Sequence, residues 1–243
     1  MQIELDPTLE IGLHGSFCCF CWLSDSLPDY DLIPDCLDEY ERSRISAYKN
    51  SADKWRFTAA RLIVRTVLAS AWGCDKSEVV LQVEQGRPYP DVQNQNPGFF
   101  SIAHSSMGIL VGFSREGHIG VDIEQEKRFP NLLGVAKRIM TFDEYAIFSK
   151  LEGDEASRAF FRLWVRKEAV LKYLGTGFSL DPALVNLGMG ISGKVRIDGK
   201  NRRLKVDDGF SDFNRSIYHW STVLPESATR VRVPKFHVKL TSE

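Results

Sequence analysis

The chain has 243 residues, of which 43% are hydrophobic, so it can bury the core of one large domain or of two smaller halves. Its 31 Lys and Arg residues against 32 Asp and Glu residues leave a formal net charge of −1. This balance excludes the overall positive field that is typical of nucleic-acid-binding proteins, so any recognition of an anion must rest on local groups.

The cysteines and the N-terminal residues indicate a protein of the cytoplasm. The cysteines are odd in number and lack the C-x-x-C spacing of a zinc site, so we expect reduced core residues at Cys18, Cys19, Cys21, Cys36 and Cys74. Residues 1–10 are acidic and polar, unlike a secretory signal. No apolar run approaches the roughly 20 residues that a membrane-spanning helix needs, so we expect no membrane partner.

The first half alternates strand-like and helical segments. An apolar run predicts a buried strand at residues 15–23, which a Pro- and Asp-containing stretch at 25–35 ends. Helical spacing predicts a polar helix over 37–49 and an apolar helix over 53–72, which Gly73 ends. Short apolar runs predict strands at 79–83, 99–103, 109–113 and 119–123, with a surface loop over 86–98.

The second half repeats this order. We expect helices at 132–140, 142–151 and 155–174, and strands at 195–197, 217–223 and 231–238. Residues 61–65 (RLIVR) resemble residues 162–166 (RLWVR). We therefore predict an α+β fold of two similar halves with pseudo-twofold symmetry, each a small, mostly antiparallel sheet packed with a long helix. A boundary near Gly117 divides them into residues 1–117 and 118–243.

Residues 120–124 (GVDIE) contain two acidic residues, Asp122 and Glu124, with one apolar residue between them. In a strand, Asp122 and Glu124 point to one face, while Val121 and Ile123 point to the other. Two neighbouring carboxylates repel each other unless a cation lies between them, and Mg²⁺ prefers such oxygen ligands. An isolated D-x-E pair also fits a solvated acidic surface. The spacing leaves both interpretations open.

Two further motifs each fit either a structural or a functional role when taken alone. In residues 164–175 (WVRKEAVLKYLG), Glu168 and Lys172 stand one helical turn apart. They fit an ordinary surface pair, or an oxygen ligand beside a cation for phosphate. His104, which follows the basic turn at residues 86–88 (GRP), fits a structural histidine or a phosphate donor.

The order of these signals is specific. Residues 55–57 (WRF), 86–88 (GRP) with 100–105 (FSIAHS), 120–124 (GVDIE) and 164–175 follow one another along the chain. This order resembles the Sfp-type 4′-phosphopantetheinyl transferases from about the first long helix to Gly177. The motifs that carry the resemblance are G-V-D-I-E and W-x-x-K-E-A-x-x-K.

The resemblance implies a metal site and a catalytic helix in the second half. Mg²⁺, or Mn²⁺ in its place, would be held against the pyrophosphate of coenzyme A by Asp122, Glu124 and Glu168. Lys172 would contact the phosphate that is transferred. Glu168 is our candidate for the base that takes the proton of the acceptor hydroxyl.

The resemblance also implies that the first half binds the nucleotide. Arg87 and His104 would bind the 3′-phosphate of coenzyme A, and Arg44 and Arg56 would add positive charge. The family usually has Asn and Ser where this chain has Ser101 and Ala103. A hydroxyl before the histidine is therefore missing, and backbone N–H groups would have to replace its contact.

The implied reaction moves the 4′-phosphopantetheine group from coenzyme A to a serine of an apo acyl or peptidyl carrier protein and releases adenosine 3′,5′-bisphosphate. Such a reaction activates fatty-acid, polyketide or nonribosomal peptide synthases. Residues 129–140 could dock a helix of the carrier, with Lys137 and Arg138 facing acidic groups, or could belong to the core. With two halves in one chain, we expect a monomer.

Three alternatives share part of this pattern. Another Mg²⁺-dependent phosphotransferase or phosphodiesterase would not need to bind a 3′-phosphate. A non-enzymic coenzyme A- or nucleotide-binding module would keep Arg87 and His104 but show no metal requirement. The smaller holo-acyl-carrier-protein synthases share the chemistry, but they are usually about half this length and assemble their site between subunits.

Overall fold

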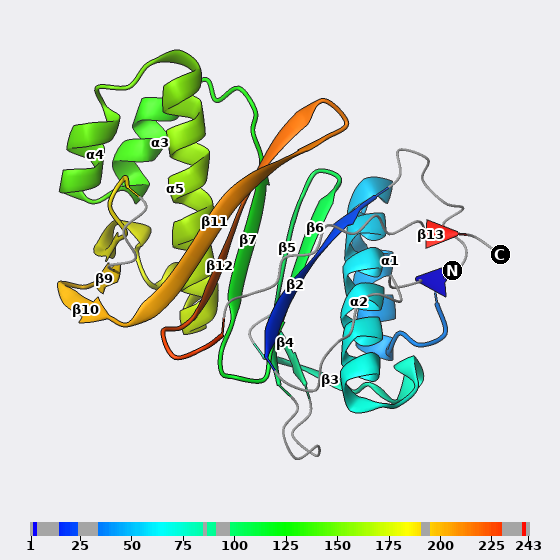
Figure 1. Cartoon of the computed structure of the whole chain (residues 1–243). Helices are drawn as coiled ribbons and strands as arrows, with labels where there is room; N and C mark the ends of the chain where they lie inside the picture. The colour runs from blue at the N-terminus through cyan, green and yellow to red at the C-terminus, as the bar shows by residue number, and fades with distance from the viewer. Residues whose placement is uncertain are drawn as a thin grey trace. The chain divides into compact units, whose positions relative to one another are not determined.

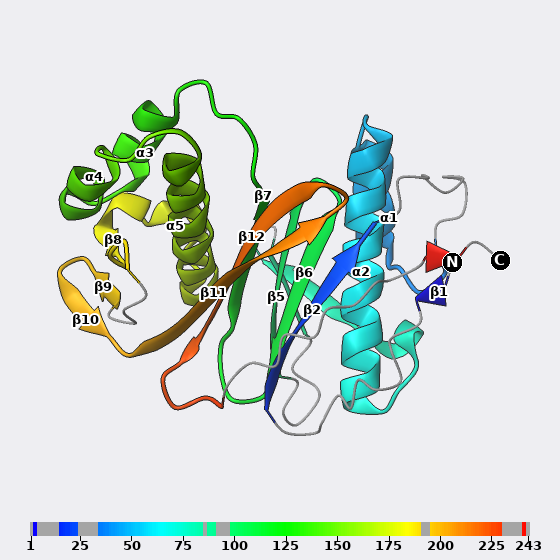
Figure 2. The same cartoon turned by 45° about the horizontal axis from the view of Figure 1, so that its top comes forward.

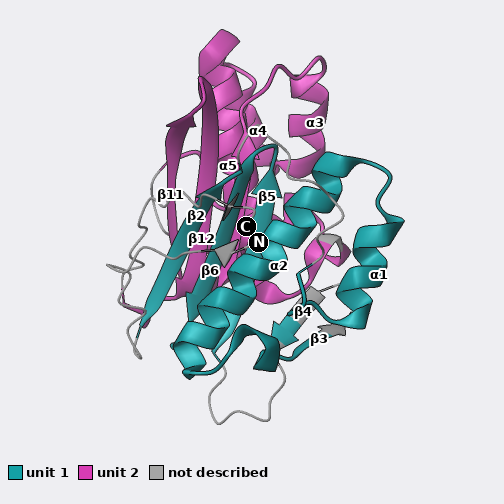
Figure 3. Ribbon diagram, turned by 90° about the vertical axis from the view of Figure 1, so that its right-hand side faces the viewer, with its two compact units in different colours: residues 1–116, 231–243 teal, residues 117–230 magenta. Residues whose placement is uncertain are grey.

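The computed structural model divides into two compact units, residues 1–116 with 231–243 (unit 1) and residues 117–230 (unit 2) (Figure 3). It describes residues 2–3, 15–23, 34–84, 87–90, 98–190, 195–229 and 240–241. From the sequence we placed residues 231–243 in the second half. In the structure, β13 (Leu240–Thr241) pairs with β1 (Gln2–Ile3), and this pairing joins the described C-terminal strand to unit 1.

Unit 1 packs a long helix against a three-stranded antiparallel sheet (Figure 1). The sheet has the order β2 (Ser16–Trp22), β6 (Gly108–Ser114), β5 (Phe99–Ser105). The other elements are α1 (Glu39–Ala47), α2 (Ser51–Trp72), a 3₁₀ turn (Lys76–Glu78) and the hairpin of β3 (Leu81–Glu84) with β4 (Arg87–Pro90). Asn50 caps the start of α2, and Gly73, at φ 70°, ends it.

Unit 2 repeats this plan with a second sheet and a second 22-residue helix. Its sheet has the order β11 (Leu204–Phe213), β12 (Ser216–Pro225), β7 (Gly120–Gln125), and α5 (Gly153–Leu174) lies along it (Figures 1 and 2). The remaining elements are α3 (Leu132–Ile139), α4 (Phe142–Phe148), two 3₁₀ turns (Gly177–Ser179 and Pro182–Leu184) and a small sheet of β8 (Val185–Asn186), β9 (Val195–Ile197) and β10 (Lys200–Arg202).

The structure confirms the α+β class. Several strands were not among the expected elements. The predicted loop at 86–98 contains β4, and β11 was not expected at all because Asp207, Asp208, Gly209 and Asp212 are residue types depleted in strands. Pairing with β12 along the whole of β11 overrides that propensity. The strand expected at 231–238 lies outside the described residues.

Two expectations about the chain as a whole can be compared with the described ranges. All five cysteines lie within those ranges, and all carry free thiols, as expected from the sequence. None of the described helices is both long and apolar enough to cross a membrane.

A glycine sets how closely β7 approaches α5. A Cβ added to Gly120 would lie 2.0 Å from the carbonyl oxygen of Ala169 and 2.5 Å from the backbone nitrogen of Tyr173. Real side chains essentially never approach backbone atoms so closely, so only glycine allows this contact. The first residue of the G-V-D-I-E motif is therefore required by packing between the strand and the helix.

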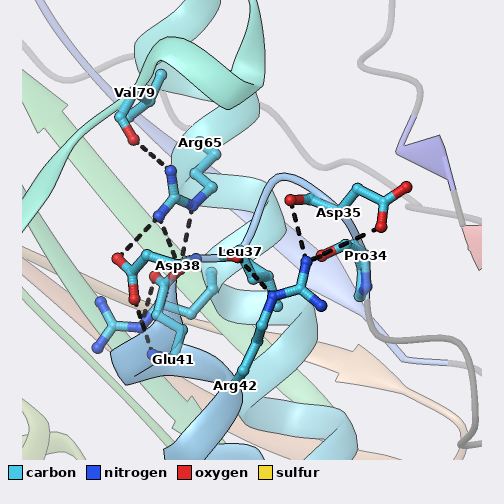
Figure 4. Close-up of polar contacts among 9 residues, drawn as sticks. Pro34, Asp35, Leu37, Asp38, Glu41, Arg42, Arg65 and Val79 are labelled. Carbon is cyan, nitrogen blue, oxygen red and sulfur yellow. Dashed lines mark hydrogen bonds and ion pairs between the residues drawn. The ribbon is translucent and has the colours of Figure 1, made fainter.

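Residues 61–65, which resemble residues 162–166, contribute two arginines to a buried ionic cluster in unit 1 (Figure 4). The Arg65 guanidinium donates to Glu41 Oε2 over 2.7 Å and also to the Val79 carbonyl, and Arg61 lies 3.6 Å from Glu41 Oε1. Only 2% of the Arg65 and Glu41 side chains is exposed. The cluster joins α1, α2 and the segment after α2.

Residues 162–166 contribute two arginines to a similar ionic cluster in unit 2. Arg162 donates to Asp208 through two nitrogens, at 2.6 Å and 3.3 Å, and Arg166 Nε lies 3.6 Å from Asp208 Oδ1. Arg166 also donates to the carbonyls of Gly188 and Gly190. In both units, two arginines one turn apart on the long helix bind a single carboxylate. This shared arrangement explains why residues 61–65 resemble residues 162–166.

Replacement of Gly120 by Ala should lower the free energy of unfolding at or above the upper end of the roughly 1–3 kcal/mol that overpacking costs, because the added methyl meets backbone atoms. Gly190→Ala is the matched control, since its Cβ would have no atom within 4 Å. Urea unfolding of both variants measures the difference. Equal stabilities for the two would contradict the packing constraint.

Glu41→Gln should cost about 3 kcal/mol in urea unfolding, because it removes the counter-charge of the buried Arg61 and leaves the buried Arg65 with Asp38 alone, at 3.2 Å. Glutamine can still close the capping box with Asp38, so the substitution tests the charge alone. Glu39→Gln, an exposed position in the same first turn, should cost less than about 1 kcal/mol. A small effect at Glu41 would show that the arginines do not need its charge.

Candidate active site

The acidic residues of β7 alternate with core residues. Val121 and Ile123 are fully buried on one face of the strand. Gly120 contacts α5 on the other face, and Asp122 and Glu124 share that face because strand side chains alternate. The two carboxylates share one face of the strand, as the sequence predicted, and that face lies toward α5.

Asp122 forms an ion pair with Lys172 of α5, fifty residues further along the chain. Lys172 Nζ donates to Asp122 Oδ1 over 2.7 Å. The Asp122 side chain is nearly buried, and its other oxygen, Oδ2, has no hydrogen-bond partner. Burial raises the pKa of Asp122 to about 6, although Lys172 acts in the opposite direction.

Glu168 lies one turn before Lys172 on α5. Its Oε1 atom is also buried and has no hydrogen-bond partner. Burial, followed by the negative charge of Asp122, raises the pKa of Glu168 to about 7 against the effect of Lys172. Glu124 raises the pKa of both carboxyls further, so the three groups interact electrostatically. We call Asp122, Glu124 and Glu168 the carboxylate cluster.

The donor atoms of this cluster suit a hard divalent cation. Two buried carboxylate oxygens without partners, Asp122 Oδ2 and Glu168 Oε1, would gain from a positive ion, and Mg²⁺ prefers such oxygen ligands. Among the described residues, however, no three His, Cys, Asp or Glu side chains are arranged to hold a metal by themselves. The fit is therefore to an ion that takes one or two carboxylates and completes its shell with substrate oxygens.

Lys167, next to Glu168, has a role that the sequence did not reveal. Its side chain is fully buried, and Nζ lies 2.8 Å from Glu144 Oε2 of α4. Lys167 also donates to the carbonyls of Pro182 and Val185, and Glu144 accepts the N–H of Leu187. Burial lowers the pKa of Lys167, while Glu144 opposes that shift. This pair fixes α5 against α4 and the segment that follows α5.

A sequence signal for part of this pair did exist. Thr141 and Glu144 form a reciprocal capping box at the start of α4, and T-x-x-E before an apolar run is its signature. The signal identifies Glu144 as a helix cap. It gives no indication that the same carboxylate also binds Lys167, 23 residues away.

Two of the residues expected to bind the nucleotide have local partners in unit 1. Arg56 forms an ion pair with Asp53 and donates to the carbonyl of Ser106 over 3.4 Å. Arg44 is exposed, with its guanidinium 5.7 Å from the centre of the Tyr48 ring. Their role toward a nucleotide stays a prediction.

The other two expected nucleotide-binding residues lie on strands. His104 is exposed on β5, whereas Ser101 and Ala103 of the same strand are buried. Arg87 begins β4, but its side chain lies outside the described part of the structure. Because Ala103 faces the core, a hydroxyl at that position would not share the face of His104.

Comparison with known protein families matches the segment that holds the carboxylate cluster. A model of the 4′-phosphopantetheinyl transferase superfamily matches residues 118–213, which include β7, α5 and β11. A protein of Synechocystis sp. that is provisionally named a 4′-phosphopantetheinyl transferase is 35% identical over 162 residues, 65% of each chain.

Two further relatives carry the same description. The 4′-phosphopantetheinyl transferase Sfp of Bacillus subtilis is 29% identical over 160 residues, which are 65% of this chain and 69% of Sfp. The 4′-phosphopantetheinyl transferase HetI of Nostoc sp. is 30% identical over 145 residues, 59% of this chain and 61% of HetI. The matches thus span slightly less than two thirds of the Synechocystis and Nostoc proteins.

The raised pKa of Glu168 predicts how stability depends on pH. The usual value is 4.5 and the folded value is about 7, so the folded chain holds a proton that the unfolded chain releases. The resulting stability is fully present below about pH 4.5 and is lost as the pH rises through about 7. Between about pH 5 and about pH 8, the free energy of unfolding of Glu168→Gln should fall by roughly 1–2 kcal/mol less than that of the wild type. The figure allows for the solvent screening of a partly exposed group.

The measurement is urea unfolding at several pH values with EDTA in the buffer. Glu155→Gln, an exposed position on the same helix, is the control and should keep the wild-type dependence. If Glu168→Gln has the same pH dependence as this control, burial does not perturb Glu168 as described.

Proposed function

We propose that this chain is a member of the 4′-phosphopantetheinyl transferase superfamily and transfers the 4′-phosphopantetheine group of coenzyme A to a serine hydroxyl of an apo carrier protein. Adenosine 3′,5′-bisphosphate is the second product. The observation that carries the proposal is the carboxylate cluster with two unsatisfied buried oxygens beside the Lys172 ammonium, within the segment that matches the superfamily. A site of this charge suits a phosphoryl transfer that needs a cation.

The carboxylate cluster is the proposed site of Mg²⁺, or of Mn²⁺. Asp122 and Glu168 would contribute their unsatisfied oxygens, and Glu124 would add charge from the same face of β7. When bound, the metal neutralises negative charge on the pyrophosphate and on the leaving bisphosphate. The closeness of three carboxylates, of which Asp122 is buried and Glu124 and Glu168 are partly buried, supports a cation here, because their mutual repulsion falls when one is present.

Lys172 is the proposed ligand of the transferring phosphate. Its ammonium is held at the cluster by Asp122, at 2.7 Å, and its side chain is 27% exposed. A bound substrate phosphate can therefore reach it, and a fixed positive charge stabilises the charge that develops during transfer.

Glu168 is the proposed general base. Without a bound cation, burial raises the pKa of Glu168 to about 7, so its carboxylate can take up a proton near neutral pH. The serine Oγ attacks the phosphorus that carries the pantetheine arm, the bond from that phosphorus to the bisphosphate oxygen breaks, and Glu168 takes the serine proton. Adenosine 3′,5′-bisphosphate leaves with the electron pair of the broken bond.

The proposed protein partner is an apo acyl or peptidyl carrier protein, and α3 is the proposed docking element. Ala136 and Ile139 of α3 are buried, so part of the segment expected to dock belongs to the core. Leu133 is 51% exposed, and Lys137 and Arg138 are exposed beside it. An apolar residue flanked by two cations suits an acidic carrier helix.

The remaining parts of the proposal concern coenzyme A and the setting. Arg44, Arg56, Arg87 and His104 of unit 1 are the proposed contacts of its 3′-phosphate region. We propose that the enzyme acts as a monomer in the cytoplasm, on carriers of fatty-acid, polyketide or nonribosomal peptide synthases.

Incubation with coenzyme A, Mg²⁺ and a panel of apo carrier proteins tests the proposal. Intact-mass spectrometry should show the gain of one phosphopantetheine group on at least one carrier, and EDTA should abolish it. Glu168→Gln should lower kcat by about 10²–10⁴-fold, the usual contribution of a general base. Glu155→Gln on the exposed side of α5 should keep the wild-type rate.

The outcomes separate the parts of the proposal. A folded wild-type enzyme that modifies none of the carriers would contradict the transfer function. Transfer at an unchanged rate by Glu168→Gln would exclude the base while leaving the function intact. Equal use of coenzyme A and its dephospho form would exclude a contact with the 3′-phosphate.

A further inference from the structure

A fourth acidic residue lies next to the carboxylate cluster. Glu126 follows β7 two residues after Glu124, and its N–H donates to the carbonyl of Ile217 over 2.7 Å, which extends the pairing with β12. Residues two apart along extended backbone lie about 7 Å from each other on one face. Without a partner of its own, Glu126 would therefore add its negative charge to the cluster.

His219 of β12 binds this carboxylate. Its Nε2 lies 2.8 Å from Glu126 Oε2, and only 6% of the histidine side chain and 16% of the glutamate side chain are exposed. His219 is the residue directly opposite Glu124 in the pairing of β12 with β7. Directly opposite residues in an antiparallel pair project to the same face, so the imidazole lies on the face that carries the cluster.

α5 holds the imidazole from the other side. The rings of His219 and Phe161 stack with their centres 5.9 Å apart and an interplanar angle of 13°. Phe161, Glu168 and Lys172 follow one another at spacings of seven and four residues, so they share a face of α5. The imidazole thus fills the space between sheet and helix, on the same helix face as Glu168.

Two contacts therefore border the cluster along the β7–α5 interface. One is the pair of Asp122 and Lys172, next to the close approach at Gly120. The other is His219, packed on α5 and bonded to Glu126. The first contact leaves acidic oxygens without partners, whereas the second gives an acidic side chain a partner.

We propose that His219 is a positioning residue: it keeps the Glu126 carboxylate out of the carboxylate cluster and thereby favours Mg²⁺ over larger divalent ions. Mg²⁺ is usually bound by one or two carboxylates plus substrate phosphates, whereas Ca²⁺ takes six to eight oxygens at longer distances. Release of Glu126 adds oxygens and negative charge to the same face, which strengthens Ca²⁺ binding more than Mg²⁺ binding. The inference rests on the proposed function, since it assigns the metal preference of the same site.

Calorimetric titration of the protein in the presence of coenzyme A, with Mg²⁺ alone and with Ca²⁺ alone, tests this role without a transfer assay. His219→Phe keeps a ring on Phe161 but cannot bond to Glu126, and His219→Leu removes both contacts. Either variant should shift the ratio of Ca²⁺ to Mg²⁺ affinity by about tenfold toward Ca²⁺, which corresponds to ~1.4 kcal/mol. His219→Gln, whose amide can still donate to Glu126, should keep the wild-type ratio.

The double variant H219F/E126Q separates positioning from packing. It lacks the released charge, so it should return the metal ratio to the wild-type value even if its melting temperature stays low. If the single variants melt earlier but keep the wild-type ratio, or if E126Q fails to restore it, His219 is a packing residue and the inference is overturned.

The two proposals fail in different ways. Wild-type protein that binds Mg²⁺ but modifies no carrier contradicts the transfer function and leaves the metal ratio as a test of His219. Wild-type protein that binds neither metal overturns the role of His219 directly. Transfer that requires Mg²⁺ in the wild type, together with transfer supported by Ca²⁺ in H219F, supports both.

Discussion

The close packing of β7 on α5 at Gly120 is the constraint on which the candidate site depends. Without a Cβ, the strand can lie against the backbone of Ala169 and Tyr173, and the next outward side chain, Asp122, then reaches Lys172. A residue with a side chain at position 120 would push the strand away from the helix. The ion pair and the electrostatic coupling to Glu168 both require this short separation.

The same packing buries acidic groups and so lowers the stability of the fold. Burial raises the pKa values of Asp122 and Glu168, so near neutral pH their charged forms lower the stability of the fold. Functional sites commonly carry such a cost, which the surrounding structure has to offset. In unit 2, the fully buried pair of Lys167 and Glu144 holds the helix that carries Glu168 in place.

The two units use one device to hold their long helices. In each, two arginines one turn apart bind one carboxylate, Glu41 in unit 1 and Asp208 in unit 2. The repeated R-x-x-x-R pattern that the sequence shows is therefore explained by packing. The proposed catalytic residues, Glu168 and Lys172, lie in the next turns of α5, outside the repeated pattern.

Local pattern was sufficient to predict much of this. The spacing of apolar residues predicted the long helices, and alternation in G-V-D-I-E predicted the shared face of Asp122 and Glu124. The order of motifs predicted a family whose model matches residues 118–213. Each of these features is set within a few residues, where helix and strand periodicity apply.

Contacts between distant residues could not be predicted in the same way. Spacing placed Lys172 on the same face of α5 as Glu168, but it gave no indication of the ion pair that Lys172 forms with Asp122, fifty residues away. Glu126 and His219 are separated by 93 residues, and no local signal links them. β11 was missed because its acidic residues and glycine oppose strand formation, and only pairing with β12 places it in the sheet.

The most direct test of the central claim is the effect of Mg²⁺ on coenzyme A binding, measured by calorimetry with the wild type and with Asp122→Asn. If the carboxylate cluster holds the metal against the pyrophosphate, Mg²⁺ should tighten binding to the wild type by about tenfold or more, ~1.4 kcal/mol, and this gain should be lost in the variant. An equal gain in both proteins would contradict the assignment of the cluster as the metal site.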